Sequence, residues 1–391
     1  MLTFKQWLSE ANKSLKKFIG IPHSAIKTIN QFINEAKMPL PMMDDEEQSS
    51  DDSSMLGAKT TVLPQDKLQD YLDRIYTGEK KKIEKYTMPY VHKSNIKDMR
   101  ITDESGKLFD TDQLKDLITK RPENLLQKNE KIKHSSGNSI QFFNIGLPAL
   151  KGLAFNERTK EFVVVDTCPG AGICKTYCYA KKGGYIQWKV SSLAQTRVLN
   201  YLLNDPEGFK NQLIGEIYSH YKSLKKRKTD LAIRWHDAGD FFSPDYWNIA
   251  KTVAETLPDV TFYAYTKLAN ISLSEKPSNF IINFSSGAKF DQEKQIDLQK
   301  IKHSLVVPFH LFGDIVTKKK GIMSFKKSDI PLLKKRIAQH YSIPVDNLLT
   351  YEEMMRRKIK NKPTYYVIVK QGDGDNSAYR KDVIGSYLLI H

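Results

Sequence analysis

Short apolar segments that look like buried strands alternate with helical segments from about residue 160 onward. The strand-like segments cover residues 161–167, 230–236, 260–267, 279–286 and 304–310, and further segments after them include an extended stretch at 364–370. Strands that alternate with helices form parallel sheets, because a crossover helix returns the chain to the same end of the sheet. The sequence therefore predicts an α/β fold, with a partial TIM-barrel-like parallel sheet and crossover helices.

Composition divides the chain into four regions. The expected regions are a basic amphipathic leader (1–36), an acidic linker rich in serine and proline (37–64), a charged helical region (65–137) and an α/β domain that carries the cysteines (138–391). A linker of that composition cannot bury a core and is expected to be disordered, so the N-terminal part is predicted to be mostly helical and partly disordered. No apolar run reaches the roughly 18 residues that a membrane span needs, so we expect a soluble protein without membrane contact.

The charge of the chain favours a polyanionic partner. Lysine and arginine outnumber aspartate and glutamate by 61 to 45, which gives a formal net charge of +16. An excess of this size favours binding to nucleic acid or nucleotides, although a solubilising lysine surface gives the same count.

All three cysteines of the chain lie in one short loop, "TCPGAGICKTYC", directly after the first strand-like segment. An odd, tightly clustered set argues against a disulfide framework and for a reducing compartment with a metal or redox site. Thiolates suit an iron–sulfur cluster or zinc. Three interpretations stay open. Cys168, Cys174 and Cys178 hold a cluster with one open iron, or they hold zinc with His236 as the fourth ligand, or they are unligated buried thiols.

Polar residues follow the other strand-like segments, where parallel sheets collect their chemistry. Gly239 permits an unusual turn after residues 230–236, and Asp240 offers a carboxylate for a substrate ammonium or ribose hydroxyls. Lys267 ends the segment 260–267 and is placed to meet a carboxylate or phosphate, and Ser285 lies at the end of the next segment. We therefore expect Gly239, Asp240 and Ser285 to bind a cofactor.

Asp237, Asp240 and Lys267 are the catalytic candidates. In the zinc-dependent alternative, a nucleic-acid base-modifying enzyme, either aspartate serves as nucleophile or base. Helix capping is the competing role for the aspartates. Ser243 before Pro244 already has the pattern of an N-cap followed by the first helical residue, which leaves both aspartates available.

Four ordered motifs resemble the bacteriophage "gene product 88" family: "CPGAGICKTYCYAKKG", "RWHDAGDFFSPDYW", "FYAYTK" and "DVIGSYLLIH". The pattern is similar in turn to radical S-adenosylmethionine proteins, with wider spacing between the cysteines and Ala-Gly-Asp in place of Gly-Gly-Glu. This resemblance implies a 4Fe-4S cluster on Cys168, Cys174 and Cys178. It also implies S-adenosylmethionine near Gly239 and Asp240, and an enzyme that acts on a nucleotide or nucleic acid.

The first residues, "MLTFKQWLSEA", resemble the capsid-targeting peptide of internal head proteins in T4-like phages. Their maturation protease cuts after an apolar-x-Glu triplet and before a small residue, which matches the bonds before Ala11 and Ala36. The resemblance implies that the phage maturation protease and the capsid interior are partners. We therefore expect the protein in the host cytoplasm or in the virion interior, where a non-enzymatic role beside packaged DNA is the third alternative.

Overall fold

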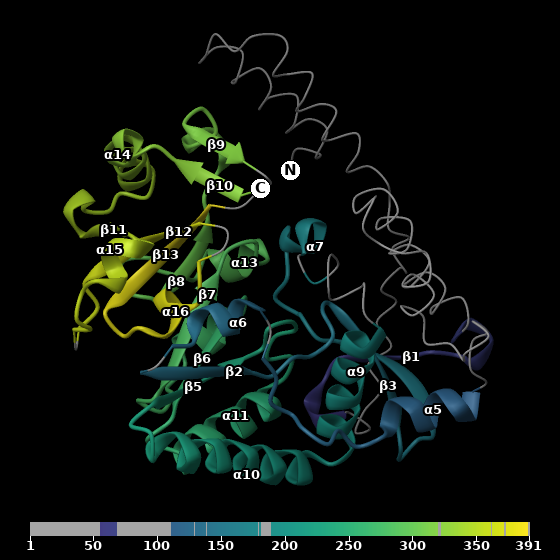
Figure 1. Cartoon of the computed structure of the whole chain (residues 1–391). Helices are drawn as coiled ribbons and strands as arrows, with labels where there is room; N and C mark the ends of the chain where they lie inside the picture. The colour runs from purple at the N-terminus through teal and green to yellow at the C-terminus, as the bar shows by residue number, and fades with distance from the viewer. Residues whose placement is uncertain are drawn as a thin grey trace, which may run out of the picture. The chain divides into compact units, whose positions relative to one another are not determined.

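The structure is a computed structural model, and it describes residues 55–68, 111–128, 130–137, 139–178, 180, 189–319, 322–360, 362–370 and 373–389 (Figure 1). The expected leader lies outside these residues, as do residues 37–54 of the expected linker and residues 69–110 of the expected charged helical region.

The central element is an eight-stranded sheet in which every neighbouring pair of strands is parallel, as the alternating pattern predicts (Figure 1). Its strands, in spatial order, are β11 (Leu348–Thr350), β12 (Tyr365–Lys370), β13 (Val383–Leu389), β8 (His303–Val306), β7 (Phe280–Ser285), β6 (Thr261–Thr266), β5 (Asp230–Trp235) and β2 (Ile140–Asn144). The α/β class is confirmed. Pro308 and the turn Phe309–Leu311 end β8 earlier than the apolar run suggested.

The middle of this sheet is covered on both faces, which explains why its central strands are mostly apolar. On one face, Trp235, Phe262 and Phe280 pack with the helices α10 (Pro206–Lys225) and α11 (Pro244–Thr256). On the other face, Phe142 and Tyr263 pack with the short helices α6 (Glu130–Ser135) and α16 (Asn376–Tyr379). Figure 1 shows α10 and α11 on one side of the strands and α6 and α16 on the other.

The helix after β5 begins as expected. The Ser243 hydroxyl accepts a hydrogen bond from the Tyr246 amide at 3.2 Å, and Pro244 occupies the first turn of α11. A second bond, from the Ser243 hydroxyl to the Leu56 carbonyl at 2.6 Å, ties this helix start to the segment near residue 55. Met55 and Ala58 are buried in the same core as α11, although both lie in the expected linker. They are apolar residues beyond its acidic stretch, which accounts for their burial.

One strand lies in a different sheet from the one we expected. Residues 161–167 were expected to open the parallel sheet, but β4 (Glu161–Asp166) pairs antiparallel with β3 (Lys151–Asn156) and with β1 (Thr60–Val62). The reason is the short link between β3 and β4, which turns at Lys160 with φ +62°, because parallel neighbours need a long crossover. The first strand of the parallel sheet is β2 instead.

The remaining helices and strands are α5 (Thr111–Thr119), α7 (Cys174–Tyr177), α9 (Lys189–Asn204), α12 (Ala269–Leu273), α13 (Phe290–Glu293), β9 (Val316–Lys319), β10 (Ile322–Phe325), α14 (Ile330–His340) and α15 (Tyr351–Met355), with short 3-10 turns at Met55–Gly57, Phe309–Leu311, Lys327–Asp329 and Val345–Asn347. Among the helices in the described ranges, none is both long and apolar enough to cross a membrane.

Tight packing between β13 and β8 gives a direct test of the strand register. A Cβ on Gly385 would lie 2.4 Å from His303 Nε2, whereas a Cβ on Gly215 of α10 has no atom within 4 Å. We expect Gly385→Ala to destabilise the fold by about 1–3 kcal/mol through overpacking. Gly215→Ala is the matched control and should stabilise the protein by about 0.5–1 kcal/mol, because alanine is the better helix former. Urea unfolding measures both changes. Equal stability of the two variants would contradict the register.

Candidate cysteine-loop site

The loop that carries the cysteines leaves β4 and docks on the ends of two parallel strands. An antiparallel bridge joins Ala171 to Ala288, just beyond β7. The amides of Gly172 and Cys174 both donate to the Gly287 carbonyl, at 3.0 and 3.1 Å, and the Lys289 amide donates to the Gly170 carbonyl at 2.9 Å. The cysteines therefore reach the carboxyl end of the parallel sheet, as expected, although β4 belongs to another sheet.

Two glycines make this docking possible. A Cβ on Gly172 would lie 2.1 Å from the Ala288 carbonyl oxygen, and one on Gly170 would lie 2.6 Å from the Lys267 carbonyl oxygen. Both contacts are with backbone atoms, which cannot move aside as a flexible side chain can. These glycines let the loop approach the exits of β6 and β7.

The three thiols share one electrostatic environment and form no disulfide. The Leu150 amide donates to Cys168 Sγ at 3.3 Å. Burial raises the pKa of Cys168, and the Asp240 carboxylate and the other two cysteines raise it further. Burial also raises the pKa of Cys174, the Lys267 ammonium lowers it, and Cys178 and Asp240 raise it.

Asp240 joins the loop to the sheet. Its Oδ2 accepts from the Lys267 amide at 2.8 Å, its Oδ1 accepts from the Phe241 amide at 2.7 Å, and its own amide donates to the Thr167 carbonyl at 2.8 Å. Burial raises the pKa of this carboxyl, and the amide hydrogen bonds and the Lys267 charge oppose that shift. Both carboxylate oxygens thus have backbone partners, so Asp240 acts first as a positioning residue for Lys267 and the cysteine loop.

Lys267 points across the strand ends. Its Nζ donates to Ser285 Oγ at 2.9 Å and to the Ser286 carbonyl at 2.8 Å, so two of the residues predicted from the sequence lie together. The backbone of Gly239 has φ +83°, which matches the predicted unusual turn, and a Cβ there would lie 2.7 Å from Leu147 Cβ.

Sequence reasoning named Ser285 but missed two serines that lie in line with it on the neighbouring strands. Ser285, Ser304 and Ser386 occupy matching positions on the adjacent strands β7, β8 and β13. Ser304 and Ser386 are 0% and 1% exposed, and their hydroxyls have no hydrogen-bond partner among the residues that the structure describes. Leaving buried hydroxyls unpaired costs about 1–3 kcal/mol each, so the row is suited to a bound water or ligand atom. The only sequence signal was a serine inside an apolar strand.

His236 and Asp237 lie in other surroundings. His236 Nε2 hydrogen-bonds Tyr246 Oη at 2.7 Å, and its ring packs edge-on against Phe241 at 4.6 Å. Burial, with a smaller contribution from Arg234, lowers the pKa of His236 to about 3, so the ring is neutral. Asp237 is buried beside Gly146, where a Cβ would lie 2.3 Å from its Oδ1. Within the described ranges, no three His, Cys, Asp or Glu side chains are grouped closely enough to hold a metal ion.

A buried ion pair also escaped the sequence analysis. Arg234 Nη1 lies 2.7 Å from Asp375 Oδ2, and the hydroxyls of Tyr263 and Tyr265 donate to the same carboxylate at 3.2 and 3.3 Å. The ion pair links the segment after β12 to β5, and its two residues are 141 positions apart in sequence.

The fold and site define an α/β protein with a parallel sheet and a three-cysteine loop at the strand exits. The family model for gene product 88 matches residues 117–340, more than half of the chain, so the protein belongs to the gene product 88 family. Two relatives are the gene 88 protein of Mycobacterium phage L5, 30% identical over 168 residues, and that of Mycobacterium phage D29, 31% identical over 150 residues.

These matches cover 40% and 37% of this chain, and 64% and 56% of the relatives, so the chain spans less than two thirds of their length. Because both relatives are phage proteins, we class this protein as a bacteriophage protein. No solved structure matches it.

Removing the positive charge of Lys267 or the negative charge of Asp240 tests whether these side chains lie close to the thiols. We expect Lys267→Gln to slow alkylation of Cys174 at pH 8, because the nearby ammonium favours the reactive thiolate. Asp240→Asn should speed it, because the carboxylate disfavours the thiolate. A change of about threefold corresponds to about half a pKa unit. Mass mapping of iodoacetamide adducts on metal-free protein measures both rates, with the exposed Glu255→Gln as control. Rates that do not differ from the control would contradict this arrangement.

Proposed function

We propose that this protein is a phage iron–sulfur enzyme similar to radical S-adenosylmethionine proteins and that it acts on a nucleotide or nucleic acid. The observation that carries the proposal is the meeting of Cys168, Cys174 and Cys178 with Asp240 and Lys267 at the exits of parallel strands. Ligand sites of α/β sheets and barrels lie at this end of the strands. The phage relatives and the net charge of +16 support the substrate class.

The donor set fits an iron–sulfur cluster better than a single zinc ion. Three cysteines complete the protein ligands of a four-iron cluster with one open iron, whereas a closed zinc site needs a fourth protein ligand. The thiols of Cys168, Cys174 and Cys178 influence one another electrostatically. The zinc alternative also requires His236, whose ring is bonded to Tyr246 and packed against Phe241.

When bound, the cluster would supply an open iron and an electron for cleavage of S-adenosylmethionine. The protein's own residues would do the rest. Lys267 keeps one ammonium hydrogen beyond its bonds to Ser285 and Ser286, and this hydrogen would donate to a carboxylate or phosphate. The hydroxyls of Ser304 and Ser386 would hydrogen-bond polar atoms of a ligand bound at the same end of the sheet. Asp240 would fix the position of the Lys267 backbone and of the start of the cysteine loop.

Anaerobic metal analysis tests the proposal. We expect about four irons and four sulfides per chain after anaerobic isolation, with a broad absorption band at about 400 nm. Cys168→Ser, Cys174→Ser and Cys178→Ser should each lose most of the iron. His236→Asn, which keeps a residue that tolerates the φ of +68° there, should retain it.

The other outcomes are equally informative. A colourless protein with one zinc that is lost in His236→Asn would support the zinc-dependent alternative instead. A chain that takes up neither metal would make the cysteine loop a structural element and contradict the enzyme proposal.

We also propose that residues 1–36 form a cleaved capsid-targeting leader, a proposal that rests on the sequence resemblance alone. We expect mass spectrometry of purified virions to detect the chain beginning at Ala11 or Ala36. The chain should retain Met1 when it is produced without the maturation protease. Absence of the protein from virions, with the intact chain in the lysate, would contradict packaging.

A further inference from the structure

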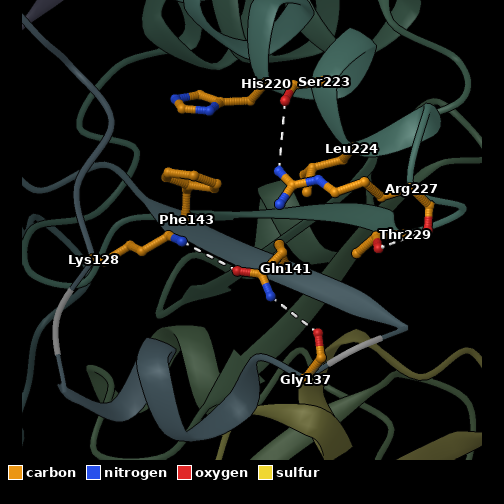
Figure 2. A pocket seen from close by; sticks show the side chains of 9 residues that line it. All are labelled: Lys128, Gly137, Gln141, Phe143, His220, Ser223, Leu224, Arg227 and Thr229. Carbon is orange, nitrogen blue, oxygen red and sulfur yellow. Dashed lines mark hydrogen bonds between the residues drawn. The ribbon is translucent and has the colours of Figure 1, made fainter.

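A second site lies beside the edge strand β2, away from the cysteine loop. A pocket of about 640 Å³ opens between β2, the end of α10 and the residues that lead into β5 (Figure 2). Its lining residues are Lys128, Gly137, Gln141, Phe143, His220, Ser223, Leu224, Arg227 and Thr229. Gly137 and Thr229 precede β2 and β5, so the pocket extends toward the amino ends of these strands, whereas the cysteine loop docks at carboxyl ends.

The charge of this pocket is positive. Among the residues that the structure describes, Lys128 and Arg227 are the charged ones that line it, and no carboxylate does. Glu216 comes near enough to influence His220, but its oxygens accept hydrogen bonds from the amides of Leu125 and Leu126 and from Gln212. The lining therefore suits an anion, for which it offers two cationic donors, better than a cation.

The two cationic side chains approach from opposite sides of the pocket (Figure 2). Lys128 Nζ donates to Gln141 Oε1 at 3.1 Å and lies 4.3 Å from the centre of the Phe143 ring, which leaves it further hydrogens to donate. The bond from Arg227 Nη2 to Ser223 Oγ is long, at 3.5 Å, so the guanidinium keeps most of its donor capacity for a ligand. The Thr229 hydroxyl and the Gln141 amide add neutral polar groups.

Two flat rings stack beside Lys128, on the side of the pocket away from Arg227 (Figure 2). The rings of Phe143 and His220 stack with centres 4.2 Å apart and planes tilted by 33° (Figure 2). Burial, and then the Lys128 charge, lower the pKa of His220, so its ring is neutral and offers a flat face. Basic groups interleaved with flat rings are the combination by which proteins hold single-stranded nucleic acid.

We propose that this pocket binds one nucleotide unit of a single-stranded nucleic acid, with the phosphate held by Lys128 and Arg227. A pocket of about 640 Å³ has the size of a small-molecule site, large enough for a nucleotide and too small to admit a duplex. The guanidinium of Arg227 matches the geometry of a phosphate, and the ammonium of Lys128 provides a second point charge. This inference does not depend on the iron–sulfur proposal, because no residue is shared.

Fluorescence anisotropy with the full chain tests the inference. The probes are a labelled single strand of about 12 nucleotides, the same sequence as a duplex, and a mononucleotide or inorganic phosphate as competitors. We expect Lys128→Gln and Arg227→Gln each to weaken single-strand binding about tenfold. The slope of log affinity against log salt should fall by about 0.7 for each phosphate that a variant no longer neutralises. Lys335→Gln, which removes an equal charge from the exposed face of α14, should change the affinity less than twofold.

Three results decide the matter. Tenfold losses confined to the two pocket variants, with the mononucleotide competing better than inorganic phosphate, support a nucleotide site. Losses no larger than that of Lys335→Gln overturn it, because binding is then general surface electrostatics. Competition by inorganic phosphate equal to that by the mononucleotide overturns the role of the rings. Iron content measured on the same variants stays unchanged if the two sites are independent, so failure here is separate from failure of the cluster proposal.

Discussion

The close backbone contact between the cysteine loop and the exits of β6 and β7 is the constraint on which the candidate site depends. It exists because Gly170 and Gly172 have no Cβ to collide with the carbonyls of Lys267 and Ala288. Through this contact, a loop that leaves an antiparallel sheet brings its thiols to the end of a parallel one. The Asp240 carboxylate fixes the same junction from the β5 side by accepting the Lys267 amide.

The contact between the cysteine loop and the strand ends is supported by a parallel sheet that packs against other elements on both faces. Its aromatic face packs under α10 and α11, and the buried pair of Arg234 and Asp375 ties the opposite face to the exit of β12. Removing one partner of such a pair costs about 3–5 kcal/mol, so the pair strongly restricts how the C-terminal strands sit against β5. The carboxyl end of the sheet is thus assembled from segments that are distant in sequence.

Local patterns made much of this arrangement predictable. Apolar runs located the strands from β5 to β8, Ser243 and Pro244 marked the start of α11, and Gly239 marked the tight turn before Asp240. These features depend on nearest neighbours in the chain. The sheet to which β4 belongs was missed, because pairing depends on the turn at Lys160 and on a partner, β1, about a hundred residues earlier.

The serine row could not be predicted because it depends on the register of β7, β8 and β13. The basic pocket could not be predicted because it joins residues that no motif connects.

The central claim is that the three thiols bind one inorganic centre at the carboxyl end of the parallel sheet. X-ray absorption at the iron edge of anaerobically isolated protein tests it most directly. The account predicts iron surrounded by sulfur with iron–iron scattering, which Cys174→Ser abolishes. Iron bound only through nitrogen and oxygen, or a spectrum that Cys174→Ser leaves unchanged, would contradict it.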